Sequence, residues 1–320
     1  MFRTILAVAV ALPAVLAGNG AYRSLSKASN ADWMKNVPDD RLISDMSIPG
    51  THESMAITGG DFTECQENFG ESGQTLAAQF KAGIRMIDIR ARINDGNTFT
   101  IHHGAVYQKA NFDDVLNKIG DFLRDHPSET VLMRLKQECT GDVGSCKDAS
   151  GQSSFQDIFD KYRRDFFWGP SVQRGSRANP PALKDVRGKL VLVVMNGKLG
   201  NPLNSYGLSS ASDWDDASST YVQDEYNVPN LGAIATKRDQ VRRFLDKSNA
   251  GDKTKLWVNF ASGASVFAQP QAVAGGALFI QGVNPFLLDY LNQGHGITRT
   301  SVIMMDFPGN DLISKIISKN

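Results

Sequence analysis

The sequence between Arg41 and Phe307 alternates short apolar runs of strand length with longer amphipathic stretches of helical period. Several of these runs are too uniformly apolar for a sheet that has one face in water. We expect strands at residues 41–48, 84–92, 99–103, 130–138, 189–196, 255–262 and 300–307. We expect helices at residues 75–83, 112–126, 153–167, 236–248 and 284–294. A strand followed by a helix, repeated along the chain, predicts parallel strands joined by crossover helices.

Two α/β architectures fit this alternation, an open doubly wound sheet and a closed barrel. No Gly-x-Gly-x-x-Gly motif follows the first expected strand, which argues against a dinucleotide-binding sheet. We therefore predict an α/β fold, an irregular TIM-type (β/α) barrel, as a single domain over residues 18–320. The long stretch at residues 197–230, rich in Ser, Asp and Asn, is expected to form part of the barrel rim.

The first residues read as a secretory signal peptide. Arg3 gives a short positive region, residues 5–17 form an apolar run, and Val-Leu-Ala at its end fits a small-residue cleavage pattern. The run is shorter than the roughly 20 apolar residues that span a bilayer. We expect residues 1–17 to be removed and the protein to be secreted.

The cysteines and the charge balance indicate which disulfides and which partners to expect. Cys139 and Cys146 flank the turn-rich sequence TGDVGS, and export permits a disulfide between them. Cys65 is then left over, and we interpret it as a free, partly buried thiol because no paired histidine accompanies it. The chain has 34 basic and 34 acidic residues, which argues against nucleic acid as a partner.

Polar residues fall at the ends of several expected strands, where a barrel places its chemistry. They are His52, Arg90, His103, Lys136 and Asp306. A lone histidine after a strand is usually structural, but five polar groups converging on one barrel mouth are not explained that way. Two histidines can take a proton from a nucleophile and give one to a leaving group, and an arginine can hold a phosphate. The pattern indicates phosphodiester cleavage.

From about Trp33 to its C-terminus the chain resembles the secreted bacterial-type phosphatidylinositol-specific phospholipases C. The motifs that carry this resemblance are SIPGTH, RMIDIRAR, IHHGAVY, HPSETVLMRLKQE, DVRGKLVLV, VQDEY, VNFAS and VIMMDF. The resemblance implies a closed but irregular TIM barrel. It also implies a reaction that uses no metal and no cofactor.

The resemblance assigns the catalytic roles. His52 is the expected general base for the inositol 2-hydroxyl, with Asp306 supporting its imidazolium, and His103 is the expected general acid. Arg90 is expected to stabilise the charge that develops on the phosphate. In metal-dependent relatives, a calcium ion has this role. Glu53 stands where the family has aspartate, so its carboxylate reaches one methylene further and is not expected to support His103 in the same way.

The resemblance also predicts a headgroup pocket. Its expected lining is Asp88, Lys136, Glu138, Asp224 and Tyr226, together with Trp214 and Asp216, whose spacing differs from that of the family. Met195 stands where the family has an arginine that contacts the inositol ring. Because this contact is missing, the resemblance does not define which headgroup is bound. Phosphatidylinositol, a glycosylated form such as a GPI anchor, and another phosphodiester all remain candidates.

A lipid substrate implies contact with a membrane surface. The glycine-rich, uncharged sequence at residues 261–279 carries Val266, Phe267 and Phe279, which would suit a loop at a lipid interface. The alternative is a loop that packs these side chains inward. We expect a monomer that meets the membrane only peripherally.

Two rival functions stay open. The first is a phosphodiesterase of the same fold acting on another lipid, which would be expected to use an acidic metal site. The second is a non-catalytic protein that binds inositol lipids, against which the presence of both histidines, Arg90 and Asp306 argues. Metal dependence distinguishes the first rival, and assay with labelled phosphatidylinositol distinguishes the second.

Overall fold

The structure, a computed structural model, describes residues 20–138, 152–196, 206–211, 214 and 219–320. The expected signal peptide at residues 1–17, Cys139, Cys146 and Asp216 lie outside the described residues. No helix in the described part of the chain is long and apolar enough to cross a membrane.

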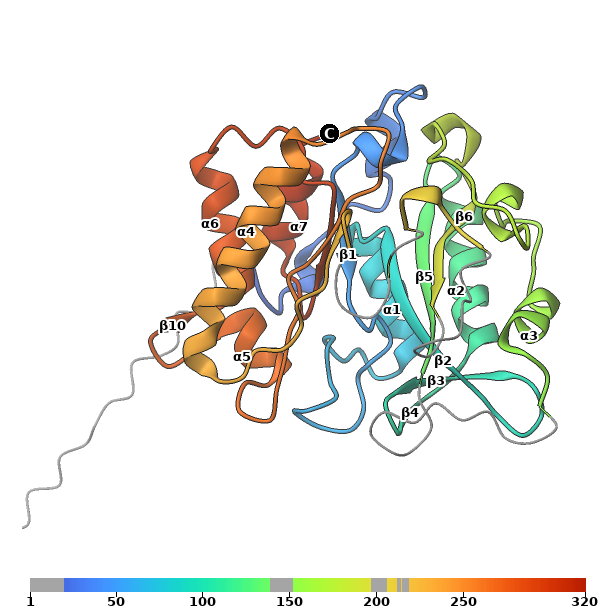
Figure 1. Cartoon of the computed structure of the whole chain (residues 1–320), viewed down its shortest axis with the longest axis horizontal. Helices are drawn as coiled ribbons and strands as arrows, with labels where there is room; N and C mark the ends of the chain where they lie inside the picture. The colour runs from blue at the N-terminus through green and yellow to red at the C-terminus, as the bar shows by residue number, and fades with distance from the viewer. Residues whose placement is uncertain (1–19, 139–151, 197–205, 212–213, 215–218) are drawn as a thin grey trace, which may run out of the picture.

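Parallel strands form the centre of the molecule (Figure 1). Neighbouring strands pair in parallel in the order β6 (Leu190–Asn196), β5 (Val131–Gln137), β2 (Met86–Ile93), β1 (Ile48–Thr51), β11 (Val302–Met305), β8 (Val258–Phe260) and β7 (Val222–Gln223). This confirms the parallel sheet of a TIM-type barrel. Within the described residues, no hydrogen-bonded pairing joins β7 to β6. The sheet is therefore a curled, incompletely closed barrel, where the resemblance implied a closed one.

An antiparallel hairpin extends this sheet on one side. It consists of β3 (Phe99–His103), which pairs with the end of β2, and β4 (Val106–Asn111). The turn between them contains Gly104 at φ 57°, a left-handed conformation that glycine adopts without strain. The sequence did not predict β4, because polar and exposed residues interrupt its apolar pattern. The turn places His103 at an end of the sheet.

Helices cover the outer face of the sheet. They are α1 (Ser72–Ala82), α2 (Phe112–Asp125), α3 (Phe155–Lys161), α4 (Ile234–Ala250), α5 (Pro270–Gly275), α6 (Val283–Gln293) and α7 (Asn310–Ile317). In Figure 1 the group α4, α6 and α7 lies on one side of the barrel, and α2 and α3 lie on the other. A second hairpin of β9 (Gly276–Ala277) and β10 (Ile280–Gln281) lies between α5 and α6 along the chain. Capping by Asn111 and Asp114 starts α2, and Pro127 follows its end.

Alternating residues of the strands build two apolar cores. Met86, Leu132 and Met304 belong to the core enclosed by the curled sheet. Ile87 and Leu135, which point the other way, belong to the core between sheet and helices. The parallel strands β1, β5 and β11 are therefore buried on both faces, which explains their largely apolar sequences.

Several expected strands are shorter in the structure than the sequence indicated, and the first of them differs most. Residues 41–48 were expected to be extended, but a 3-10 helix occupies Ile43–Asp45 and β1 begins only at Ile48. Ile43 and Met46 are nevertheless fully buried in the inner core. The apolar pattern predicted correctly that this segment is buried, but it predicted the wrong backbone conformation.

Candidate active site

His52 and Asp306 come directly after two paired strands. Thr51 of β1 lies opposite Met305 of β11, so the next residue of each strand meets its counterpart at the same edge of the sheet. Nδ1 of His52 lies 2.9 Å from Oδ1 of Asp306, and the Asp306 carboxylate is buried. The side chain of Asn284 on α6 donates to the Asp306 carbonyl at 2.8 Å and helps to fix this strand end.

The hydrogen bonds of His52 define its tautomer. Nη2 of Arg90 lies 3.0 Å from Nε2 of His52, and a guanidinium can only donate. Nε2 therefore accepts, and Nδ1 carries the proton that it donates to Asp306. Burial lowers the pKa of His52 well below its ordinary value, and the charge of Arg90 adds to this shift. Burial raises the pKa of Asp306, while Arg90 and Lys237 oppose that rise. The imidazole is thus a neutral base.

Arg90 is surrounded by carboxylates. Its Nη1 lies 2.7 Å from Oε1 of Glu53, and its Nη2 lies 3.2 Å from Oδ2 of Asp88. A third carboxylate, that of Glu138, lies 3.8 Å from Nη1. Burial alone would raise the pKa of Asp88, but Arg90 and Arg134 hold it below its ordinary value. The result is a fixed positive fork at the centre of the site.

Glu53 and His103 complete the centre. Nδ1 of His103 donates to the Thr63 carbonyl at 2.7 Å, which turns Nε2 towards Oε1 of Glu53 at 3.7 Å. Glu53 has a left-handed backbone, with φ 43°, a conformation that costs energy for a non-glycine residue and often marks functional sites. Burial raises the pKa of Glu53 to about 7, although Arg90 and His103 oppose the rise. The short contact of Glu53 is with Arg90, and His103 lies beyond hydrogen-bond distance.

Most of the residues predicted for the headgroup pocket lie around this centre. Glu138 accepts from the backbone of Gly104, and Lys136 on β5 lies beside Arg90 in the sheet register. Oδ2 of Asp224, after β7, lies 3.8 Å from Arg134, whose guanidinium stacks 4.5 Å above the Trp214 ring. The side chain of Tyr226 is more than half exposed.

Met195 is not part of this group. A register shift between Met133 and Arg134 leaves one extra residue in β6, so Val194 pairs with Arg134 and Met195 pairs with Leu135. Met195 is fully buried in the core between sheet and helices, the same core that contains Leu135. The expectation that Met195 occupies an inositol-contacting position is therefore corrected: a one-residue bulge turns its side chain to the opposite face.

Two charged residues of the site escaped the sequence analysis. Arg134 is fully buried beneath the pocket, 3.7 Å from Asp88. A charge in an apolar strand, two residues before Lys136 and so on the same face, was a signal that could have revealed it. Lys237 on α4 is also buried, and its Nζ donates to the Glu225 carbonyl at 2.9 Å. Burial lowers its pKa to about 8. Its polar helical neighbours gave no signal of burial.

Cys65 is free and buried, close to the catalytic pair. Burial raises its pKa well above the ordinary value, and the Asp306 carboxylate adds to the shift. The thiol is therefore protonated and a poor nucleophile, as expected of a non-catalytic cysteine. The expectation that no histidine accompanies it is wrong, because its Sγ lies 4.0 Å from Nδ1 of His103.

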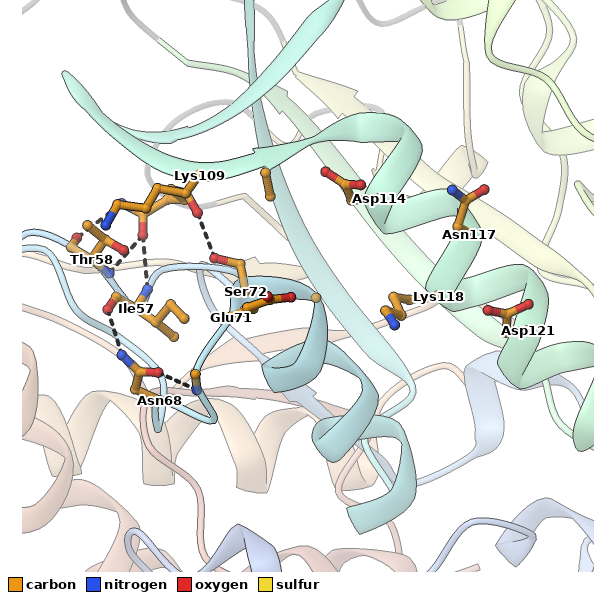
Figure 2. A pocket seen from close by; sticks show the side chains of 14 residues that line it. Ile57, Thr58, Asn68, Glu71, Ser72, Lys109, Asp114, Asn117, Lys118 and Asp121 are labelled. Atoms are coloured by element: carbon orange, nitrogen blue, oxygen red, sulfur yellow. Dashed lines mark hydrogen bonds between the residues drawn. The ribbon is translucent and has the colours of Figure 1, made fainter.

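A separate groove of about 650 Å³ lies between α1, α2 and β4. Figure 2 shows Glu71 and Ser72 at the start of α1, with Lys118 and Asp121 of α2 across the groove. None of the predicted site residues that the structure describes lines it. Charges of both signs line the groove, and its backbone donors at Ile57 and Thr58 already bind the Gln108 side chain. It therefore gives no indication of a particular ligand.

Fold and site together define a TIM-type barrel protein with an acid–base centre of two histidines, an arginine and carboxylates. The X domain of phosphatidylinositol-specific phospholipase C matches residues 46–196. The 1-phosphatidylinositol phosphodiesterase of Listeria monocytogenes is 30% identical, with 92% of this chain and 86% of the relative covered. The enzyme of the same name from Staphylococcus aureus is 30% identical, with 93% and 96% covered.

A solved structure agrees with these sequence matches. The phosphatidylinositol-specific phospholipase C of Listeria monocytogenes superimposes with a TM-score of 0.69 at 27% identity, covering 92% of this chain and 99% of that one. The chain belongs to the family of bacterial phosphatidylinositol-specific phospholipases C.

Proposed function

We propose that the protein is a secreted phosphatidylinositol-specific phospholipase C. It cleaves phosphatidylinositol to diacylglycerol and inositol 1,2-cyclic phosphate. The observation that carries this proposal is the arrangement around Arg90, which contacts the base His52 on one side and the Glu53 carboxylate beside His103 on the other. Two proton-transfer groups thus flank one positive phosphate-binding group.

The proposed reaction begins at Nε2 of His52. This nitrogen removes the proton of the inositol 2-hydroxyl, whose oxygen forms a bond to phosphorus. The bond from phosphorus to the diacylglycerol oxygen breaks, and that oxygen takes the Nε2 proton of imidazolium His103. Oε1 of Glu53 lies 3.7 Å from this nitrogen. The two histidines exchange their protonation states, and solvent restores them.

Arg90 supplies the electrostatic part of the mechanism. Glu53, Asp88 and Glu138 hold the guanidinium in place, so it does not need to reorganise when charge develops on the phosphate oxygens. An internal 2-hydroxyl also avoids the entropic cost of recruiting water. The cyclic phosphate should therefore precede any open monophosphate.

A substrate panel with and without EDTA tests the proposal, with products followed by phosphorus NMR. We expect inositol 1,2-cyclic phosphate from phosphatidylinositol, formed at an unchanged rate in excess EDTA. Loss of activity in EDTA that calcium restores would refute the arginine mechanism. Faster cleavage of a sphingolipid or glycerophosphodiester would favour the rival phosphodiesterase, and lipid binding without product would favour the non-catalytic binder.

We further propose that the barrel mouth contacts the membrane through the side chains predicted from the sequence. Val266, Phe267 and Phe279 are 70%, 74% and 88% exposed, which supports lipid contact over inward packing. In Figure 1 the loop after β8 and the loop after β1 both lie on the lower side of the molecule, and the β9–β10 hairpin, whose turn carries Phe279, lies to their left. One solved structure of the Staphylococcus aureus relative concerns modulation of its membrane binding.

Paired substrates test this contact. The double variant Phe267→Ser, Phe279→Ser should lose at least about tenfold of its activity on phosphatidylinositol vesicles, because apolar area that would enter the bilayer is removed. Hydrolysis of soluble inositol 1,2-cyclic phosphate should stay within about twofold. Equal losses on both substrates would contradict membrane contact. For secretion, the exported protein should begin after Ala17 by N-terminal sequencing.

A further inference from the structure

Three side chains that could ligate a metal ion meet at the catalytic pair, which supplies two of them. One ligand atom each from His52, Cys65 and Asp306 lies within 4.8 Å of the others. The groups come from the end of β1, the segment that follows it, and the end of β11. Backbone hydrogen bonds fix Cys65, which donates to Ala56 and accepts from Phe307, both at 2.9 Å. The cluster is therefore built into the fold.

The proposed reaction uses only part of this cluster. His52 and Asp306 form the base pair, whereas the Cys65 thiol takes no part in proton transfer. Its Sγ lies 3.8 Å from the Thr63 carbonyl and 4.0 Å from Nδ1 of His103, long contacts even for sulfur. The thiol thus adds a soft ligand to an imidazole and a carboxylate.

The three groups match the preferences of zinc. Zn²⁺ binds thiolate, imidazole and carboxylate at about 2.0 to 2.3 Å in tetrahedral geometry, which places ligand atoms roughly 3.4 to 3.7 Å apart. Nδ1 of His52 and Oδ1 of Asp306 lie 2.9 Å apart, closer than this, whereas the ligand atoms of the cluster span up to 4.8 Å. Forming the site therefore requires side-chain movements of roughly 1 Å. The carboxylates of Glu53 and Asp88 add negative charge nearby, and Arg90 is the main opposing charge.

We propose that His52, Cys65 and Asp306 form an inhibitory site for a thiophilic divalent cation of the zinc class. Binding at Nδ1 of His52 releases the thiol proton to solvent and moves the Nδ1 proton to Nε2, which can then no longer accept the hydrogen bond from Arg90. A fourth coordination position is left for water. It engages both the base and its supporting carboxylate, so the 2-hydroxyl of the substrate is no longer deprotonated. The inhibition rests on the proposed function, whereas binding of the cation does not.

Cadmium binding tests the site without any substrate. Titration of the purified protein with Cd²⁺ should produce a thiolate-to-cadmium charge-transfer band that saturates at one equivalent, and Zn²⁺ should displace it. The band should vanish in Cys65→Ser and persist in the matched control Cys139→Ser, Cys146→Ser. His52→Ala, used only in the binding measurement, should weaken cadmium binding at least tenfold. It tests the site independently if a Cys65 variant does not fold. A band unchanged in Cys65→Ser and His52→Ala would overturn the site.

Inhibition is then measured with phosphatidylinositol in metal-free buffer. Cys65→Ala should keep the wild-type rate within about twofold and require at least tenfold more Zn²⁺ for half inhibition. Equal sensitivity of Cys65→Ala and wild type would overturn the inhibitory role. A protein that binds one cadmium through Cys65 but cleaves no phosphatidylinositol would support the metal site and refute the proposed function.

Discussion

The guanidinium of Arg90 lies 3.0 Å from Nε2 of His52, the nitrogen that must accept the substrate proton. In the free protein, the general base is therefore hydrogen-bonded to the same guanidinium that would stabilise the phosphate. In the substrate complex, the 2-hydroxyl must replace this hydrogen bond, which frees one Arg90 donor for a phosphate oxygen. This hydrogen bond therefore links the general base, His52, to the electrostatic catalyst, Arg90, before the substrate binds.

Arg90→Lys should lower kcat at least about a hundredfold, because an ammonium cannot reach a phosphate and keep Glu53 and Asp88 paired at once. Arg92→Lys, two residues further along β2, is the matched control and should stay within about twofold. Steady-state kinetics on vesicles gives the answer. A near-wild-type kcat for Arg90→Lys would show that any positive charge is sufficient.

The adjacent histidines of IHHGAVY should behave differently. His103→Ala and His52→Ala should each lower turnover at least about a hundredfold, the low end for general acid–base catalysis. His102 points away from His103 on β3, and its ring packs 5.4 Å from that of Tyr107. His102→Gln should therefore keep turnover within about threefold. A larger loss from His102→Gln than from His103→Ala would reverse the assignment.

The sequence predicted the central site because its residues lie on strands or directly after them. Arg90 lies within β2, whereas His52 and Asp306 directly follow β1 and β11. Strand ends and the two-residue period of a strand determine where the side chains of His52, Arg90 and Asp306 lie. Both features can be recognised in short sequence motifs. Tertiary features were harder to predict. The bulge in β6 leaves no trace in a uniformly apolar run, and it reverses the direction of Met195. Lys237 is buried where α4 packs on β7 and β8, a contact that the helical sequence pattern does not show.

The orientation of Met195 changes what an arginine would do there. Met195→Arg should lower the free energy of unfolding by roughly 3 kcal/mol or more, because a charge without a partner would enter the core shared with Leu135. Met195→Leu, similar in volume, should cost less than about 1.5 kcal/mol. Urea denaturation measures both. Greater kcat/KM on phosphatidylinositol at unchanged stability in Met195→Arg would instead place this side chain in the pocket.

Lys237 should make stability depend on alkaline pH. Its Nζ binds the Glu225 carbonyl and the Gln223 side chain, beneath the segment that carries Asp224. Burial lowers its pKa from 10.5 to about 8, so between these values the unfolded chain holds a proton that the native state has lost. The free energy of unfolding must therefore rise with pH in this window, by about 3 kcal/mol in total.

Lys237→Met removes the titrating group and should remove this rise. Urea denaturation of wild type and variant between about pH 7 and pH 11 gives the difference in unfolding free energy, which should change by about 3 kcal/mol in favour of the wild type as pH increases. Lys81→Met, at an exposed position on α1, is the matched control and should parallel the wild type. Parallel curves for wild type and Lys237→Met would mean that Lys237 keeps its ordinary pKa, and that its hydrogen bonds to residues 223 and 225 fully offset the cost of burying its charge.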